Sequence, residues 1–354
     1  MTFHITLLIA FVCSLCLGFF LNRFFLKRPL KFLVKKANKS AVRWSSQSKP
    51  IFGGITFFSI FFLGFIAYML IIDNSILTNP KYIALFITVT LSFFMGLADD
   101  IINTPPSFKF IIQVLNAVIF ISMDVYIIIS PFPLLNYIIT GIWVVGIMNS
   151  INMLDNMDSV TNLISLSIIT GILFSLILTN GEADFMTFLL AVIAGSMISF
   201  LYYNWNPSKM YMGDNGSQFL GTILAYFGIV YFWNAIPLEE VSFGFNSKQV
   251  VIVILAFIVP LSDTTTVTIN RLMRGQSPFV GGRDHTTHHL SYAGLSDREV
   301  ALTLFIINSI CVSIAFYVIH NTPNWNSTWF WSLISLAFII FASLYSLTKI
   351  TKAK

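Results

Sequence analysis

The chain has 354 residues, of which 56% are hydrophobic and only 10% are charged, and its formal net charge is +5. This composition is too apolar for the surface of a water-soluble globular protein. The positive charge follows the loops between apolar stretches, so it indicates membrane orientation and argues against nucleic acid as a partner.

Apolar stretches recur along the whole chain, and a membrane crossing takes about 20 helical residues. The first stretch lacks a preceding basic segment and a small-residue cleavage site, so we interpret it as a retained helix and not as a signal peptide. The sequence therefore predicts an all-α polytopic membrane protein with a single integral-membrane domain over residues 1–354. About eleven transmembrane helices are expected, at 4–26, 51–72, 81–98, 109–129, 134–150, 160–179, 184–203, 217–234, 249–270, 300–320 and 328–349.

Lysine and arginine in the loops predict the orientation. The loop 27–50 carries eight of these residues, whereas the loops on the opposite side have almost none. We therefore expect a periplasmic N-terminus and a cytoplasmic C-terminus. The further loops on the cytoplasmic side would be 99–108, 149–159, 204–216 and 271–299.

This orientation can be tested with reporter fusions. A reporter fused after residue 160, or at the C-terminus, should read as cytoplasmic, and one fused within 235–247 should read as periplasmic. The reverse pattern would place the four loops in the periplasm and contradict a site that faces the cytoplasm.

Polar motifs are concentrated in these cytoplasmic loops. They are "GLADD" (96–100), "NSINMLDNMDSV" (149–160), "YMGDNGSQ" (211–218) and "GGRDHTTHHL" (281–290). Because the orientation was assigned from lysine and arginine alone, the clustering of acids and histidines is independent information. It predicts one composite site that faces the cytoplasm.

Acidic residues stand at two of the expected helix ends. Asp99 and Asp100 are adjacent, and Mg²⁺ takes carboxylate oxygens of this kind together with phosphate and water. Asp214 lies just before Ser217, near a helix N-terminus, where exposed N–H groups favour a phosphate. The alternatives are solvated loop acids at 99 and 100 and a simple helix cap at 214.

A polar stripe follows the fifth expected span. Asn149, Asn152, Asp155 and Asp158 recur at every third residue, which on a helix would place them on one broad face. A polar stripe at the end of two apolar spans indicates a water-filled cleft. The alternative is an ordinary polar turn.

The motif at 281–290 combines an arginine, an aspartate and three histidines. Zinc ligation is one interpretation of this combination. Recognition of an anion and a sugar is the other, since arginine binds phosphate and histidine donates hydrogen bonds. Upstream, Asp263 lies in an apolar span, so we expect it to be paired or to face a polar cavity.

Taken together, the acids, the bases and the helix N-terminus are typical of metal-assisted phosphoryl transfer. Two other classes stay open. A transporter would hold its acids near mid-membrane, and an intramembrane aspartyl protease would need two acids that face each other.

At these residues the chain resembles the polyprenyl-phosphate N-acetylhexosamine-1-phosphate transferase family, and its eleven expected spans resemble the WecA-type branch. The resemblance runs from Lys49 to Arg298. It rests on "KPIFGG", "GLADD", Lys109 and Gln113 in "FKFIIQ", "NSINMLDNMD", "YMGDNGS", and "MRGQSPF" before the histidine motif.

The resemblance implies a bacterial enzyme of the cytoplasmic membrane that starts a cell-surface glycan. Its donor would be a UDP-N-acetylhexosamine, its acceptor undecaprenyl phosphate, and its by-product UMP. The expected cofactor is Mg²⁺, with Mn²⁺ as a substitute. The expected partners are the two substrates, membrane lipids and a second copy of the chain in a homodimer.

The resemblance also implies roles for individual residues. The metal ligands would be Asp214, Asp99 and Asn152. The expected catalytic residues are Asp99, Asp100, Asp155, Asp158, His285, His288 and His289. The expected substrate-binding residues are Lys49, Lys109, Asn149, Asn152, Asn204, Tyr211 and Arg283, of which Asn204 and Tyr211 would contact uracil and Lys109 would neutralise phosphate.

Two motifs depart from the family pattern. The usual D-G-x-D-G is here "DNMDS", with Asn156 and Ser159 in place of glycines, and the usual H-x-H-H is here "HTTHH", one residue longer. Both adjoin the expected nucleotide-sugar pocket, so the sugar stays open. N-acetylglucosamine is the default, and a galacto-, fuco- or diamino-sugar is the alternative.

Overall fold

The protein is described by a computed structural model, which covers residues 2–28, 49–180, 184–236, 247–278 and 281–351. Within these ranges the chain is helical, apart from loops and an isolated parallel bridge between Ile51 and Tyr211. The all-α fold is therefore confirmed. The elements, in order, are α1 Thr2–Lys27, α2 Gly53–Ile71, η2 Asn74–Thr78, α3 Pro80–Ile102, α4 Pro106–Ser122, α5 Pro133–Leu154, α6 Val160–Asn180, α7 Phe185–Asn204, α8 Asp214–Gly228, η3 Ile229–Trp233, α9 Ser247–Ala256, α10 Ile258–Met273, α11 Thr286–Tyr292, α12 Asp297–Asn321 and α13 Ser327–Ile350.

Each of the eleven expected spans coincides with a helix or a pair of helices. Among the described residues, eight helices are long and apolar enough to cross a membrane, and nine if the bent pair α9–α10 is counted as one span. The protein is therefore a multi-pass membrane protein. The count of eleven stays a prediction, because α4 has 17 residues and α8 has 15.

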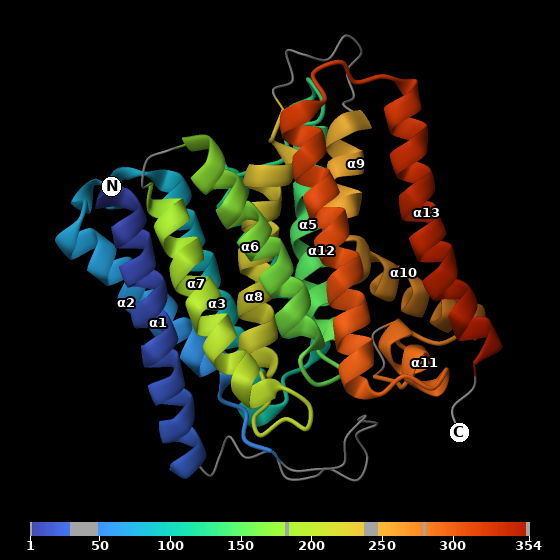
Figure 1. Ribbon diagram of the computed structural model, residues 1–354, viewed down its shortest axis with the longest axis horizontal. Coiled ribbons are helices and arrows are strands. Elements are labelled where there is room, and N and C mark those ends of the chain that lie inside the picture. The colour runs from blue at the N-terminus through green and yellow to red at the C-terminus, as the bar shows by residue number, and fades with distance from the viewer. Residues whose placement is uncertain (1, 29–48, 181–183, 237–246, 279–280, 352–354) are drawn as a thin grey trace.

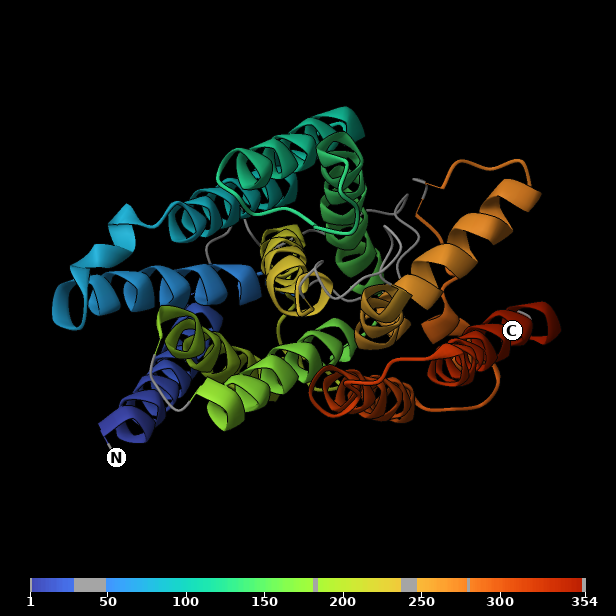
Figure 2. The same cartoon turned by 90° about the horizontal axis from the view of Figure 1, so that it is seen from above.

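Helix α8 lies at the centre of the bundle. It packs against α2, α3, α5 and α6, and Figure 2 shows it enclosed by other helices. All residues from Asn215 to Gly228 are buried, including Ser217, Gln218 and Thr222. A helix with no face toward lipid can carry polar side chains if other helices satisfy them, so α8 can present polar groups to its neighbours.

The ninth expected span is not one continuous helix, which corrects the prediction for 249–270. It breaks after Ala256, and α10 continues at an angle of 85° to α9, as Figure 1 shows. Pro260 lies in the first turn of α10, where it needs no N–H donor. Side chains of the neighbouring helices satisfy the backbone there: Ser150 Oγ donates to Pro260 O over 2.7 Å, and Asn308 Oδ1 accepts from Val259 N over 3.4 Å.

The helices extend into the polar motifs. The sequence predicts a loop that begins at Asp99. Instead, α3 continues to Ile102, so Asp99 and Asp100 lie in the last turn of this helix. Within the expected loop 204–216, α8 already begins at Asp214. These polar residues continue the helices because neighbouring elements supply hydrogen-bond partners, so the end of an apolar run does not mark the end of a helix.

The polar stripe after α5 is only partly helical. α5 ends at Leu154, so Asn149 and Asn152 lie on it, whereas Asp155 and Asp158 belong to the following turn. The prediction of one helical face for all four is wrong. The short helix α11 likewise replaces part of the expected loop 271–299.

The motif-bearing ends of α3, α5, α7 and α8 gather at one end of the bundle, the lower end in Figure 1. Polar contacts join them there. The assignment of this end to the cytoplasm stays a prediction. Much of the basic charge on which it rests, namely Lys31, Lys35, Lys36, Lys39, Arg43, Lys352 and Lys354, lies outside the described residues.

Candidate active site

Lys109 joins two of the acidic motifs. Its ammonium nitrogen lies 2.6 Å from Asp99 Oδ2 and 2.6 Å from Asp214 Oδ2. α3, α4 and α8 thus each contribute one charged group to the same point. Thr104 Oγ1 donates to the other oxygen of Asp99 over 2.7 Å, which fixes the orientation of that carboxylate.

Asp100 points to the start of α8. Its Oδ2 accepts from the backbone N–H of Asn215 over 3.0 Å and from the Asn215 side-chain amide over 2.7 Å. Gly213 precedes the helix with φ +79°, and a Cβ there would lie 2.7 Å from Asp100 Oδ2. Glycine is therefore required both by the backbone conformation and by the close approach of the carboxylate. The two acids of "GLADD" have different partners.

The segment "KPIFGG" holds the other side of the same turn. Tyr211 N donates to Pro50 O over 3.0 Å, and Gly53 N donates to Tyr211 O over 3.2 Å. A Cβ on Gly54 would lie 1.8 Å from Asn215 Oδ1, so this contact also requires glycine. The segment therefore supports the loop that leads into Asp214.

Amide side chains connect α4 and α5 to α8 one turn further into the bundle. Asn149 Nδ2 donates to Gln113 Oε1 over 2.8 Å, and Gln113 Nε2 lies 3.3 Å from Gln218 Oε1. Asn152 Nδ2 donates to Ser217 Oγ over 2.8 Å. Asn152 therefore contacts α8 directly and Asn149 is linked to it through Gln113, while the contact of both with substrate stays a prediction.

Asp158 and Lys49 contact the loop after α7. Asp158 accepts from Ser208 N over 2.9 Å and from Ser208 Oγ over 2.8 Å, and Lys49 Nζ donates to Ser208 Oγ over 3.1 Å. The same ammonium lies 5.0 Å from the centre of the Tyr211 ring. Both charges therefore have a structural task in this loop, and their contact with a nucleotide stays a prediction.

Asn204 is also bound within the protein. Its Oδ1 accepts from Ser159 N over 3.0 Å, and its Nδ2 donates to Met210 O over 3.0 Å. Ser159 has φ +70°, a left-handed conformation that explains why glycine suits this position. Asn204 thus stabilises this turn, and the expected contact of Asn204 and Tyr211 with uracil stays a prediction.

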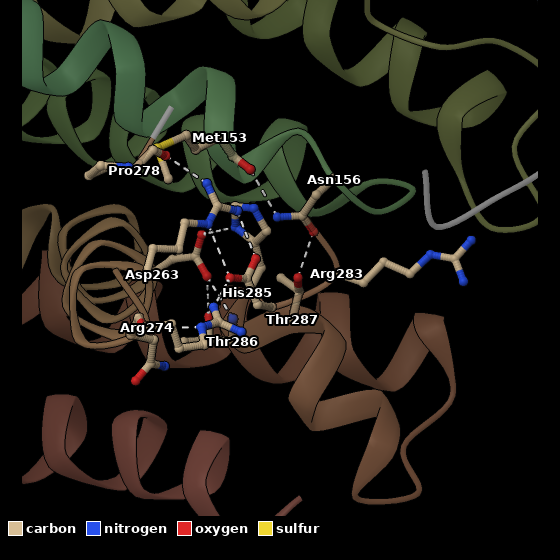
Figure 3. A network of polar contacts seen from close by, with 12 residues as sticks. Met153, Asn156, Asp263, Arg274, Pro278, Arg283, His285, Thr286 and Thr287 are labelled. Atoms are coloured by element: carbon tan, nitrogen blue, oxygen red, sulfur yellow. Dashed lines mark hydrogen bonds and ion pairs between the residues drawn. The ribbon is translucent and has the colours of Figure 1, made fainter. Parts of the chain in front are cut away.

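A second group of charges surrounds the histidine motif (Figure 3). Arg271 makes two hydrogen bonds to Asp284, of 3.0 and 2.7 Å, and Arg274 makes a third. Burial alone would raise the pKa of Asp284, but the two arginines outweigh it and lower the pKa to about 2. Asp284 is therefore ionised at neutral pH. Arg283 is exposed and extends away from this group, so its contact with phosphate stays a prediction.

The three histidines of the motif have different surroundings. His285 Nδ1 lies 2.8 Å from Asp263 Oδ2. His289 Nδ1 lies 2.7 Å from Thr351 Oγ1, just after the end of α13. His288 is buried and packs edge-on against His285, with ring centres 5.5 Å apart.

His288 should make stability depend on pH. Burial, followed by repulsion from His285, lowers the pKa of His288 to about 3, whereas an unfolded histidine titrates near 6.5. Below pH 6.5 the unfolded state binds a proton at His288, whereas the folded state stays unprotonated there. The contribution of His288 to the free energy of unfolding is therefore fully present above pH 6.5 and decreases as the pH falls toward 3. Between pH 6.5 and 5 this loss should reach about 2 kcal/mol.

This dependence can be measured by thermal unfolding of the purified protein between pH 7.5 and 5. His288→Gln should flatten the decline in unfolding temperature. His4→Gln, at an exposed position of α1, should leave it unchanged. An equally steep decline in both variants would contradict a buried neutral His288.

The end of α5 connects the two groups of charges. Asn156 Oδ1 accepts from Thr287 Oγ1 over 2.6 Å, which ties the turn after α5 to α11. Asn152, two residues before the end of α5, contacts α8 through Ser217. Asp155 is half-buried in this turn. The expected acids and histidines therefore belong to neighbouring regions at one end of the bundle.

Several partners in this site were not expected from the sequence. The motifs assign no role to Arg271 and Arg274, yet both bind Asp284. Asp263 had been expected to be paired, and His285 is its partner. No spacing rule links these residues, because their contacts depend on the break between α9 and α10.

The part of the chain described by the structure contains no group of three or more histidine, cysteine, aspartate or glutamate side chains placed to hold a metal. Asp99 and Asp214 nevertheless converge on one cation, the Lys109 ammonium. Two carboxylate oxygens that share a cation suit a hard divalent ion, which often takes one or two protein carboxylates. Asn152, the third expected metal ligand, donates a hydrogen bond to Ser217, three residues after Asp214. Its contact with a metal stays a prediction.

Comparison with known proteins identifies relatives of this chain. The model of glycosyl transferase family 4 matches residues 82–232. A probable undecaprenyl-phosphate N-acetylglucosaminyl 1-phosphate transferase of Bacillus subtilis is 29% identical over 290 residues, which are 78% of this chain and 75% of the relative.

Two further relatives extend the comparison. A decaprenyl-phosphate N-acetylglucosaminephosphotransferase of Mycobacterium leprae is 26% identical over 255 residues, 65% of this chain and 63% of the relative. A phospho-N-acetylmuramoyl-pentapeptide-transferase of a Nitratiruptor species is 24% identical over 347 residues, 84% of this chain and 90% of the relative. The chain is thus similar to glycosyl transferase family 4 over residues 82–232 and, over up to 84% of its length, to polyprenyl-phosphate hexosamine-phosphate transferases.

Proposed function

We propose that this protein transfers N-acetylglucosamine-1-phosphate from UDP-N-acetylglucosamine to a polyprenyl phosphate, with undecaprenyl phosphate as the acceptor. An oxygen of the lipid phosphate attacks the β-phosphorus of the donor. The bond between the β-phosphorus and the bridging oxygen breaks, and UMP leaves with that oxygen. The product, a lipid-linked sugar diphosphate, would start a cell-surface glycan.

The observation that carries this proposal is the meeting of Asp99, Lys109 and Asp214 at the N-terminus of α8. Phosphoryl transfer depends chiefly on positioning and on neutralising the charge of phosphate oxygens. The Lys109 ammonium can contact a phosphate oxygen, and the first N–H groups of α8 add a favourable field. The Asp100 carboxylate keeps the start of α8 in place.

The donor set also fits a divalent cation. Asp214 and Asp99 would hold Mg²⁺, and Mn²⁺ would substitute for it. When bound, the ion would neutralise charge on the pyrophosphate and on the departing UMP. The exposed Arg283 and the histidines of α11 would contact the sugar and the pyrophosphate.

The lysine argues against the protease alternative. An aspartyl protease needs two carboxylates that share a proton, whereas Asp99 and Asp214 both bind an ammonium here. The location of the charged groups at one end of the bundle is unlike the mid-membrane site of a transporter. We further propose that this end faces the cytoplasm of a bacterial cell and that two chains form a homodimer.

Release of UMP by the purified protein tests the proposed reaction. With undecaprenyl phosphate and UDP-N-acetylglucosamine we expect UMP and lipid-linked sugar diphosphate in equal amounts. UDP-N-acetylgalactosamine, tested in parallel, addresses the sugar. The proposal is wrong if no UDP-N-acetylhexosamine yields UMP in the presence of the lipid.

Removal of metal should stop the reaction. EDTA should abolish UMP formation, and Mg²⁺ or Mn²⁺ should restore it, because the carboxylates would otherwise repel the pyrophosphate. Ca²⁺ serves as a control for ionic strength and charge alone. Full turnover in rigorously metal-free buffer would contradict the metal requirement.

A further inference from the structure

Asp263 is an acidic side chain on α10, shortly after the bend between α9 and α10. It lies in the second turn of α10 and its exposed fraction is 0%. A buried carboxylate is costly unless hydrogen-bond donors surround it. Three donors do so. Thr286 N and Thr286 Oγ1 bind Oδ1 over 2.8 and 2.6 Å, and His285 Nδ1 lies 2.8 Å from Oδ2.

These contacts define the protonation of the His285 ring. An ionised carboxylate can only accept hydrogen bonds, so Nδ1 of His285 must carry the proton. The ring is held from a second side by the edge-on contact with His288. Nε2 is therefore the nitrogen that His285 can offer to another molecule.

Asp263 pairs with His285, because the nearby arginines are bound to a different carboxylate. Arg271 and Arg274, at the end of α10, are both bound to Asp284. Within the described ranges, the hydrogen bonds of Asp263 go to the start of α11, through His285 and Thr286, as Figure 3 shows. A neutral acceptor would suffice to bind the first N–H of α11, so the charge at Asp263 is explained by the histidine.

We propose that Asp263 is a positioning residue for the transferase reaction. It holds the ring of His285 with Nδ1 protonated, so that Nε2 is presented as a hydrogen-bond acceptor to a hydroxyl or amide N–H of the donor sugar. The contact with the donor rests on the function proposed above. The orientation and protonation of the ring rest on the geometry alone.

Asp263→Asn changes only the histidine contact. The backbone N–H of Thr286 cannot reverse, so the amide oxygen must stay with Thr286 and the NH₂ group must face His285 Nδ1. The ring would then lose its proton at Nδ1 and carry one at Nε2. We expect kcat to fall about 100-fold, the effect of removing one well-placed hydrogen-bonding group from a transition state, while KM for UDP-N-acetylglucosamine changes little.

A double-mutant cycle separates positioning from structural stabilisation. If Asp263 acts through His285, the combination of Asp263→Asn with His285→Gln should lose no more turnover than His285→Gln alone. The matched control is Thr286→Val, which removes a hydrogen bond to the same carboxylate without touching the histidine, and it should keep turnover within about 3-fold. Losses that multiply in the double variant would overturn the proposal.

Nitrogen NMR of the ¹⁵N-histidine-labelled protein tests the ring directly and needs no activity. The His285 signal, assigned by its disappearance in His285→Gln, should show a protonated Nδ1 in the wild type and an unprotonated Nδ1 in Asp263→Asn. An unprotonated Nδ1 in the wild type would overturn the proposal. If the wild type releases no UMP, the proposed function fails while this measurement still decides the role of Asp263.

Discussion

Replacement of Lys109 by methionine should reduce UMP formation about 100-fold. The Lys109 ammonium lies 2.6 Å from Asp99 and 2.6 Å from Asp214. Without it, the carboxylates of Asp99 and Asp214, which contact each other directly, repel each other with no cation between them. They also repel the anionic substrates, so both the affinity for the donor and the rate should fall.

Lys109→Arg keeps the charge and tests whether the compact ammonium is required. A guanidinium cannot occupy the same point between two carboxylates, so we expect an intermediate loss. Asp124→Asn is the matched control, since Asp124 is an exposed acid just beyond the other end of the same helix, α4. Turnover of Lys109→Met within a few-fold of wild type would contradict the role of the lysine.

Metal binding gives a second measurement on the same variants. If Lys109 and a divalent cation share the two carboxylates, Lys109→Met should bind Mn²⁺ more tightly than the wild type, as measured by electron paramagnetic resonance. Asp214→Asn should bind it more weakly. Equal Mn²⁺ affinity in all three proteins would show that the metal does not bind at the carboxylates that contact Lys109.

Local sequence patterns were sufficient to predict the helices of the bundle. A membrane helix is defined by a continuous apolar run, so the eleven stretches coincide with helices although no tertiary information was used. The same reasoning placed Asp214 near the start of α8, because glycines flank it. It failed at Asp99 and Asp100, since partners on α4 and α8 allow α3 to continue through them.

Contacts between distant segments could not be predicted in this way. The break after Ala256 is marked by Pro260, yet the run around it stays apolar and looks like a single span. Arg271 binds Asp284 only because α10 turns aside and the chain returns to it. The partner of a buried charge is set by packing, which the spacing of residues along the chain does not record.

The two departures from the family motif illustrate the same limit. Asn156 stands where a glycine was expected, and Thr287 lies in the lengthened histidine motif. In the structure these two side chains form a hydrogen bond of 2.6 Å. In the sequence, Asn156 and Thr287 belong to two unrelated departures from the family motifs. In the fold, their side chains form one contact that joins the turn after α5 to α11.

The two acids of "GLADD" should respond differently to substitution, although the resemblance implies a catalytic role for both. Asp99 is bound to the Lys109 ammonium, so Asp99→Asn removes a charge from the point where phosphate is expected. Its turnover should fall about 100-fold. Asp100 accepts both hydrogen bonds from Asn215 at Oδ2, and an asparagine oxygen can accept the same two bonds. Asp100→Asn should therefore lose about 10-fold or less, and Asp100→Ala, which loses both bonds to α8, should lose more.

The pH dependence of Asp99→Asn shows what its carboxylate does. If Asp99 removed a proton from the lipid phosphate, raising the pH would ionise the phosphate without help and restore turnover. A phosphate monoester has a second pKa of about 6, so at pH 7 the lipid is already mostly a dianion. We therefore expect the loss in Asp99→Asn to stay constant between pH 7 and 8.5, with binding of UDP-N-acetylglucosamine still measurable. Recovery of turnover with rising pH would assign Asp99 the role of a base, and near-wild-type turnover in Asp99→Asn and Asp100→Ala alike would exclude both acids from the site.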